Sequence, residues 1–238
     1  SVVITVSDIS PDRELLQEMV NHGYDINIYD HHQTADWVPS VLPGAVVDLS
    51  GHESGVSLLY RYFENRYRLK RKRLAHLVDT IRQWDIWEWV TTGNTISKQL
   101  SVLFYMLGYD RFVQLYVDRF TGKTISDDLP LILSEHMLFV NARMESSQRV
   151  IDSVTPTQVV SRRVFGYNAA IIFAGSGFSF SDGSYQFLRR YPDYDIMINV
   201  DLARRTLSYR TIRNDIDLSR LAETVGGGGH QKSSGSPI

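Results

Sequence analysis

The order of extended and helical segments in the first thirty residues constrains the fold of this chain most. Residues 2–7 and residues 26–30 are apolar runs with β-branched side chains, which are typical of buried strands. Between them, the segment SPDRELLQEMVNHG predicts a helix with Ser10 as its N-cap, Pro11 at the first helical position and Gly23 just beyond the end. A strand, a helix and a second strand in succession predict a parallel sheet and therefore a fold of the α/β class.

The sequence pattern changes part-way along the chain and indicates two lobes. From Ser54 to about Asp152, apolar residues recur every three to four positions, which predicts helices. Residues 157–175 and 195–213 have the pattern of strands, with a helix near Gly183–Arg190 between them. We therefore expect a parallel-sheet domain with a helical insert at 1–130, a linker helix at 131–155, and a smaller α/β domain with a mixed sheet at 156–238.

The composition is that of an ordinary globular protein and argues against several classes of partner. Apolar residues make up 43% of the chain, charged residues 22%, and the formal net charge is -2. A long nucleic-acid duplex would call for a basic stripe, so we do not expect one as a partner. No apolar run approaches the roughly 20 residues of a membrane span, so no membrane partner is expected, and the sequence is compatible with a homodimer.

The absence of cysteine limits the chemistry that the chain can perform. It excludes disulfide bonds and thiolate metal sites, and it suits a reducing compartment. We therefore expect a cytoplasmic location.

Acidic and imidazole side chains follow both of the first two predicted strands. Asp8 comes directly after residues 2–7, and Asp30, His31 and His32 end the second run. Functional groups of parallel sheets gather at the carboxyl ends of the strands, so these residues predict one site. The alternatives are an Asx turn or helix cap at Asp8, and a polar turn that caps the next helix at the histidines.

A run of four glycines, in VGGGGHQKSSG, lies near the end of the sequence. Because glycine is so flexible, we expect this run to form neither a stable helix interior nor a packed strand. It can present backbone N–H groups to an anion, with His230 and Lys232 adding charge or donors. The alternative is a flexible linker or tail.

Together, DHH at a strand end and GGGGH some two hundred residues later resemble the DHH phosphoesterase superfamily with its DHH-associated C-terminal domain. Four further segments resemble motifs of this family in the same order, namely VSD, ESGVSLLY, RQWDIWEW and LSYRTIRNDIDLSRLAETVGGGGH. The tryptophan-rich aspartate motif and the compact length resemble the nano-RNase or oligoribonuclease branch. The resemblance implies a two-lobed phosphodiesterase that clamps short single-stranded RNA or a small nucleotide between its lobes.

The resemblance also implies a metal centre. Asp8 would bridge two ions, and His31 and Asp85 would bind one of them. Two divalent ions about 3.5–4 Å apart can neutralise a phosphate, generate hydroxide and stabilise the leaving oxygen. Carboxylates combined with imidazole suit Mn²⁺ better than Mg²⁺. Asp79 competes with Asp85 for this role, but their spacing of six does not place both on one face of a helix.

Further roles follow from the same resemblance. Asp30 would orient an imidazole by accepting its ring N–H, and His32 would serve as hydrogen-bond donor or acid to the leaving oxygen. Arg210 would grip a substrate phosphate, although an exposed arginine on a strand is the alternative. The full set of implied substrate-binding residues is Ser54, Ser208, Arg210, Gly227, Gly228, Gly229 and His230.

The chain departs from the family in one respect. The family's first strand is followed by an Asp-x-Asp motif that supplies ligands to both metals, and no segment here matches it. We expect that motif upstream of Ser1 and expect metal binding by the chain as printed to be impaired. A catalytically incomplete nucleotide-binding or scavenging protein of the same fold is therefore an alternative. Hydrolysis of cyclic dinucleotides or of 3′,5′-bisphosphate nucleotides is another.

Overall fold

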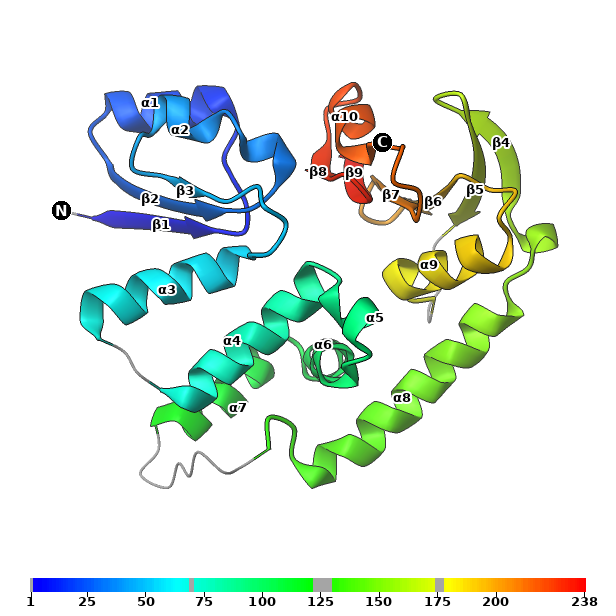
Figure 1. The fold of residues 1–238 in the computed structure, drawn as a ribbon, viewed down its shortest axis with the longest axis horizontal. Coiled ribbons are helices and arrows are strands. Elements are labelled where there is room, and N and C mark those ends of the chain that lie inside the picture. The colour runs from blue at the N-terminus through cyan, green and yellow to red at the C-terminus, as the bar shows by residue number, and fades with distance from the viewer. Residues whose placement is uncertain (1, 69–70, 122–129, 174–177) are drawn as a thin grey trace. The chain divides into compact units, whose positions relative to one another are not determined.

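The computed structural model describes residues 2–68, 71–121, 130–173 and 178–238 (Figure 1). The chain divides into two compact units, Ser1–Met144 and Glu145–Ile238. A three-stranded sheet lies in the first unit and a six-stranded sheet in the second. The predicted two-lobed α/β class is confirmed. Within the described part of the chain, no helix is both long and apolar enough to cross a membrane.

The sheet of the first unit is parallel throughout. Its strands are β1 (Val3–Ser7), β2 (Asp25–Asp30) and β3 (Val46–Val47), in that order across the sheet. Helices α1 (Arg13–Asn21) and α2 (Val38–Val41) lie on one side of the sheet, and α3 (Gly55–Tyr67) lies on the other (Figure 1). Buried Leu16, Ile28 and Val38 join the sheet to the first two helices. Because the strands are parallel, their carboxyl ends meet at one edge, where the polar residues lie.

The start of α1 differs from the prediction. Asp12, rather than Ser10, is the N-cap, because its carboxylate accepts a hydrogen bond from the N–H of Leu15 at 2.9 Å. The hydroxyl of Ser10 donates instead to the carboxylate of Asp30. This long-range bond competes with capping, so Ser10 and Pro11 precede the helix. Gly23 follows the helix end with φ +71°, as expected.

The remainder of the first unit is helical. It contains η1 (Gln33–Ala35), α4 (Lys72–Asp85), α5 (Glu88–Thr92), α6 (Thr95–Leu107), α7 (Tyr109–Thr121) and the first part of α8 (Ser134–Ser153), which continues into the second unit. Leu77, Leu100, Leu103 and Val140 are buried together at the centre of these helices. Leu77 belongs to α4, the helix that ends at Asp85.

The sheet of the second unit is mixed. Its order is β4 (Val160–Val164), β5 (Tyr167–Phe173), β6 (Ile196–Asp201), β7 (Thr206–Thr211), β9 (Ser233–Pro237) and β8 (Gly228–His230). Strands β5 and β6 are parallel, and the other neighbours pair antiparallel. Helix α9 (Phe180–Arg190) packs on one face against Ala170 and Met197, and α10 (Leu218–Glu223) packs on the other against Ile196 and Tyr209. A short turn, η2 (Pro156–Gln158), precedes β4.

The glycine run forms part of this sheet, so the expectation that it forms no packed strand is wrong. In the β8–β9 hairpin, Gly228 pairs with Gly235 and His230 pairs with Ser233. A Cβ at Gly227 would lie 2.0 Å from the carbonyl oxygen of Gly235, and one at Gly229, with φ +133°, would lie 2.7 Å from that of Ser233. The close approach of the two backbones therefore requires glycine here.

Candidate functional site

Asp8 is held by backbone groups in an uncommon conformation. It follows β1 with φ +68°, in the left-handed region that few residues other than glycine adopt. Its N–H donates to the carbonyl oxygen of Tyr29 at 2.9 Å, which continues the pairing with β2 by one residue. The N–H of Gly55 donates to Oδ1 of Asp8 at 3.1 Å. Because Gly55 is the first residue of α3, Asp8 lies at a helix N-terminus, where a carboxylate is favoured.

Gly55 is essential to this contact. A Cβ at this position would lie 2.4 Å from the backbone nitrogen of Asp8. The preceding residue, Ser54, is the N-cap of α3 and exchanges hydrogen bonds with Ser57 in a capping box. The helix therefore begins at a residue that lacks a side chain, and the backbone of Asp8 lies directly against it.

His31 brings two carboxylates together. Its side chain is 1% exposed, and its Nε2 lies 3.0 Å from Oδ1 of Asp8 and 2.9 Å from Oδ2 of Asp85. The three atoms that could bind a metal all lie within 4.8 Å of one another. The structure thus brings together the three residues that the sequence predicts as ligands. Asp79 instead forms an ion pair with Arg82.

The two carboxylates of this cluster favour a positive charge between them. Burial opposes protonation of His31, but the contact with Asp8 and the nearby charges of Asp85 and Asp8 outweigh it and raise the pKa of His31 to about 10. The hydrogen bond with His31 lowers the pKa of Asp8. In the metal-free protein, the site therefore contains an imidazolium between two carboxylates.

Oδ2 of Asp85 provides a test of whether these residues fit a metal ion. It is buried and has no hydrogen-bond donor in favourable geometry among the described residues, although Nε2 of His31 lies near it. Two carboxylate oxygens and one imidazole nitrogen that face the same point form a suitable donor set for a divalent cation such as Mn²⁺. Such an ion would displace the proton of His31, because only the neutral ring can bind a metal.

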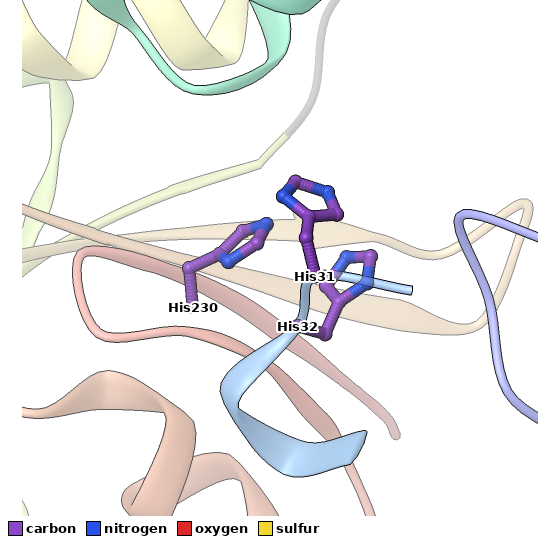
Figure 2. Close-up of side chains that lie close together, drawn as sticks. All are labelled: His31, His32 and His230. Carbon is purple, nitrogen blue, oxygen red and sulfur yellow. The ribbon is translucent and has the colours of Figure 1, made fainter. Parts of the chain in front are cut away.

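Asp30 orients His32 rather than His31. Its side chain is 1% exposed, and its Oδ1 accepts hydrogen bonds from the N–H of His31 at 2.7 Å, the N–H of His32 at 3.1 Å and Nδ1 of His32 at 2.7 Å. Burial raises the pKa of Asp30, but these bonds and that from Ser10 outweigh it and lower the pKa to about 2. The rings of His31 and His32 adjoin at the end of β2, with centroids 4.8 Å apart (Figure 2).

In the second unit, several of the predicted substrate residues share one face of the sheet. Arg210 on β7 pairs with Ser233 on β9, and Ser233 pairs with His230 on β8. His230 is labelled in Figure 2. Residues opposite each other in antiparallel strands project to the same face, and Ser208, two positions before Arg210, does so as well. This is the face that carries α9, since Met197 is the neighbour of Arg210 on β6.

Contacts from α9 orient the guanidinium of Arg210. Its Nη2 donates to Oγ of Ser181 at 2.6 Å, and the group lies 5.9 Å from the centre of the Phe180 ring. Burial lowers the pKa of Arg210 to about 10, so the side chain remains a cation at neutral pH. An oriented, partly desolvated arginine is suited to binding a phosphate.

Two of the predicted residues have structural tasks. Ser54 is 1% exposed and caps α3. The N–H of Gly227 donates to the carbonyl oxygen of Ala222 at 2.8 Å, so this N–H is already used within the unit. The substrate roles of Ser54 and of the glycines remain predictions.

Sequence reasoning missed three contacts, namely those of Ser10 with Asp30, of Gly55 with Asp8 and of Ser181 with Arg210. A glycine directly after an N-cap serine was a usable signal for Gly55, because glycine is a poor helix former. Nothing local in the sequence marks the other two, since each acts through a partner that is distant along the chain.

Comparison with known proteins gives two curated relatives. No protein-family model matches the chain. Oligoribonuclease NrnB of Bacillus subtilis is 29% identical over 233 residues, which cover 95% of this chain and 56% of the relative. An uncharacterized protein of Acanthamoeba polyphaga mimivirus is 24% identical over 238 residues, which cover 98% of this chain and 52% of that protein. The chain spans about half the length of the curated relatives it matches.

Because the similarity to NrnB covers 95% of this chain, it runs through both units. The predicted resemblance to the DHH phosphoesterases is confirmed. DHH enzymes are metal-dependent, which agrees with the donor set at His31.

Solved structures that align with the chain have low TM-scores. They include the pGpG-specific phosphodiesterase PggH from Vibrio cholerae, with TM-score 0.43 and 14% identity, covering 99% of this chain and 92% of that one. An exopolyphosphatase-related protein from Bacteroides fragilis has TM-score 0.37 and 15% identity, covering 99% of this chain and 66% of that one.

Proposed function

We propose that this chain is a Mn²⁺-dependent phosphodiesterase of the DHH type that hydrolyses short oligoribonucleotides or small nucleotides. The observation that carries the proposal is the convergence of Asp8, His31 and Asp85 on one point. The similarity to an oligoribonuclease supports the choice of substrate class. The net charge of -2 also favours a short substrate over a long duplex.

Asp8, His31 and Asp85 would hold the divalent cation. When bound, such an ion neutralises phosphate charge and lowers the pKa of a coordinated water to near neutrality. The chain's own contribution is to fix these three donors before the ion arrives. Asp8 is held by the backbones of Tyr29 and Gly55, so little reorganisation is needed for binding.

His32 is the proposed acid for the leaving oxygen. Asp30 remains a carboxylate at neutral pH and holds Nδ1 of His32 at 2.7 Å, which fixes the orientation of the ring. Nε2 is then the nitrogen that can pass a proton to the departing ribose oxygen. A buried carboxylate that orients a histidine is a common arrangement for general acid–base catalysis.

Release of mononucleotide from a labelled diribonucleotide tests the proposal directly. The chain as printed and the protein encoded by the full open reading frame are assayed in parallel with Mn²⁺. EDTA serves as the control. We expect turnover that requires the metal. Tight binding of the diribonucleotide by both proteins without turnover would overturn the proposal in favour of a nucleotide-binding protein.

Replacement of Arg210 by alanine separates substrate binding from metal binding. We expect the KM for the diribonucleotide to rise about 10- to 100-fold, since a hydrogen bond to a charged group contributes about 1.5–3 kcal/mol. Metal affinity, measured by calorimetry, stays at the wild-type value. Arg204→Ala is the matched control, because that side chain is 83% exposed on a turn of the same unit. An unchanged KM for Arg210→Ala would show that Arg210 binds no substrate phosphate.

A further inference from the structure

Asp85 lies at a corner between two helices. It is the last residue of α4, where the helix dipole disfavours a carboxylate. The chain then turns sharply, because Trp87 has φ +64° before α5 begins at Glu88. Asp8, by contrast, is fixed by two backbone hydrogen bonds. Two backbone hydrogen bonds, from Ile86 to Arg82 and from Trp87 to Trp84, lie beside Asp85, but neither involves its carboxylate.

Arg82, one turn before Asp85, spans this corner. Its Nη1 lies 2.6 Å from Oε2 of Glu88, so one ion pair connects the last turn of α4 with the first residue of α5. Its Nε and Nη2 donate to Oδ1 of Asp79 at 3.0 and 2.8 Å. The side chain is only 17% exposed, so these contacts are better shielded from solvent than those of an ordinary surface pair.

The same guanidinium reaches the opposite side of the metal site. Nη1 of Arg82 donates to the carbonyl oxygen of His52 at 3.0 Å. That carbonyl lies just before Ser54 and Gly55, the residues that begin α3 and hold Asp8. Arg82 thus connects the segment that carries Asp85 with the segment that fixes Asp8.

We propose that Arg82 is a positioning residue that sets the separation between the Asp8 and Asp85 carboxylates. The inference rests on the metal site proposed above and adds a residue that does not itself touch the ion. Two like charges must be held close together before the cation arrives, and a fixed frame lowers the cost of doing so. Lysine can retain the charge at this position but cannot reach three groups at once.

Calorimetric titration of the metal-free protein with Mn²⁺ tests this role without any assay of hydrolysis. Loss of outer-shell contacts typically costs about 10- to 100-fold in metal affinity, and we expect a loss of this size for Arg82→Ala. Arg82→Lys should recover part of the lost affinity. Glu88→Gln, which removes one of the three contacts, should give a smaller loss than Arg82→Ala.

Two controls separate positioning from general loss of stability. Arg61→Ala removes an ion pair between α3 and Glu53, the residue after His52, without involving α4. Leu103→Ala destabilises the helical core of the first unit, a cluster that contains none of the three proposed ligands. Both should bind Mn²⁺ with wild-type affinity, and the melting temperature of each variant is measured alongside.

The outcomes distinguish this inference from the proposed function. Wild-type affinity in Arg82→Ala would overturn the inference alone, as would an equal loss in an equally destabilised Leu103→Ala protein. If Arg82→Ala does not fold, wild-type affinity in both Arg82→Lys and Glu88→Gln would overturn the inference. If neither the chain as printed nor the protein encoded by the full open reading frame binds Mn²⁺, the metal site itself is wrong, and the inference falls with it.

Discussion

Replacement of His31 by alanine is expected to abolish metal binding and to reduce hydrolysis of a diribonucleotide by about 10³-fold or more, since a bound metal supplies several kcal/mol of transition-state stabilisation. Both carboxylates approach this imidazole, at 3.0 Å for Asp8 and 2.9 Å for Asp85. Its loss removes a metal ligand. It also leaves the two carboxylates facing each other without the cationic ring between them, so the metal-free protein should lose stability as well.

Three measurements check the prediction for His31. Mn²⁺ affinity comes from calorimetry, turnover from release of mononucleotide, and stability from the melting temperature without metal. His22→Ala is the matched control, because His22 is exposed at the end of α1 and its Nδ1 lies 2.8 Å from the backbone carbonyl oxygen of Glu18. Retention of wild-type Mn²⁺ affinity in His31→Ala would exclude the ligand set proposed here.

The features that sequence reasoning predicted depend on local patterns. The runs before Asp8 and Asp30 are β-branched and apolar, and a capped amphipathic helix separates them. These patterns require a parallel βαβ unit, and the unit in turn places both polar groups at one edge of the sheet. The convergence of Asp8 with His31 therefore follows from topology. The position of Asp85 came from the family resemblance, because no local pattern relates α4 to that edge.

The features that were missed depend on contacts between distant residues. Ser10 and Asp12 are both good N-caps, and the hydrogen bond from Ser10 to Asp30 decides between them. The strand in the glycine run forms because β9 approaches more closely than any side chain would allow. In each case the deciding partner is about 5 to 20 residues away, beyond the range of propensity and capping rules.

The replacement of Gly55 by alanine should damage the first unit, although it adds only a methyl group. In an exposed helix this substitution stabilises by about 1 kcal/mol, because alanine has the higher helix propensity. Here the added Cβ would lie 2.4 Å from the nitrogen, 2.6 Å from the Cα and 2.7 Å from the Cβ of Asp8. Those atoms belong to a strand end that is already in a left-handed conformation, so they cannot move aside cheaply.

We therefore expect Gly55→Ala to destabilise the protein by about 1–3 kcal/mol or more, as overpacking of a rigid site does. It should also weaken Mn²⁺ binding, because the N–H of Gly55 and the carboxylate of Asp8 are forced apart. Gly44→Ala is the matched control, since nothing lies within 4 Å of a Cβ at that position. Its melting temperature and metal affinity should stay near wild type. If Gly55→Ala instead raised the melting temperature and kept its metal affinity, helix propensity would dominate at this position. The close contact between α3 and Asp8 could then not be what holds that carboxylate in place.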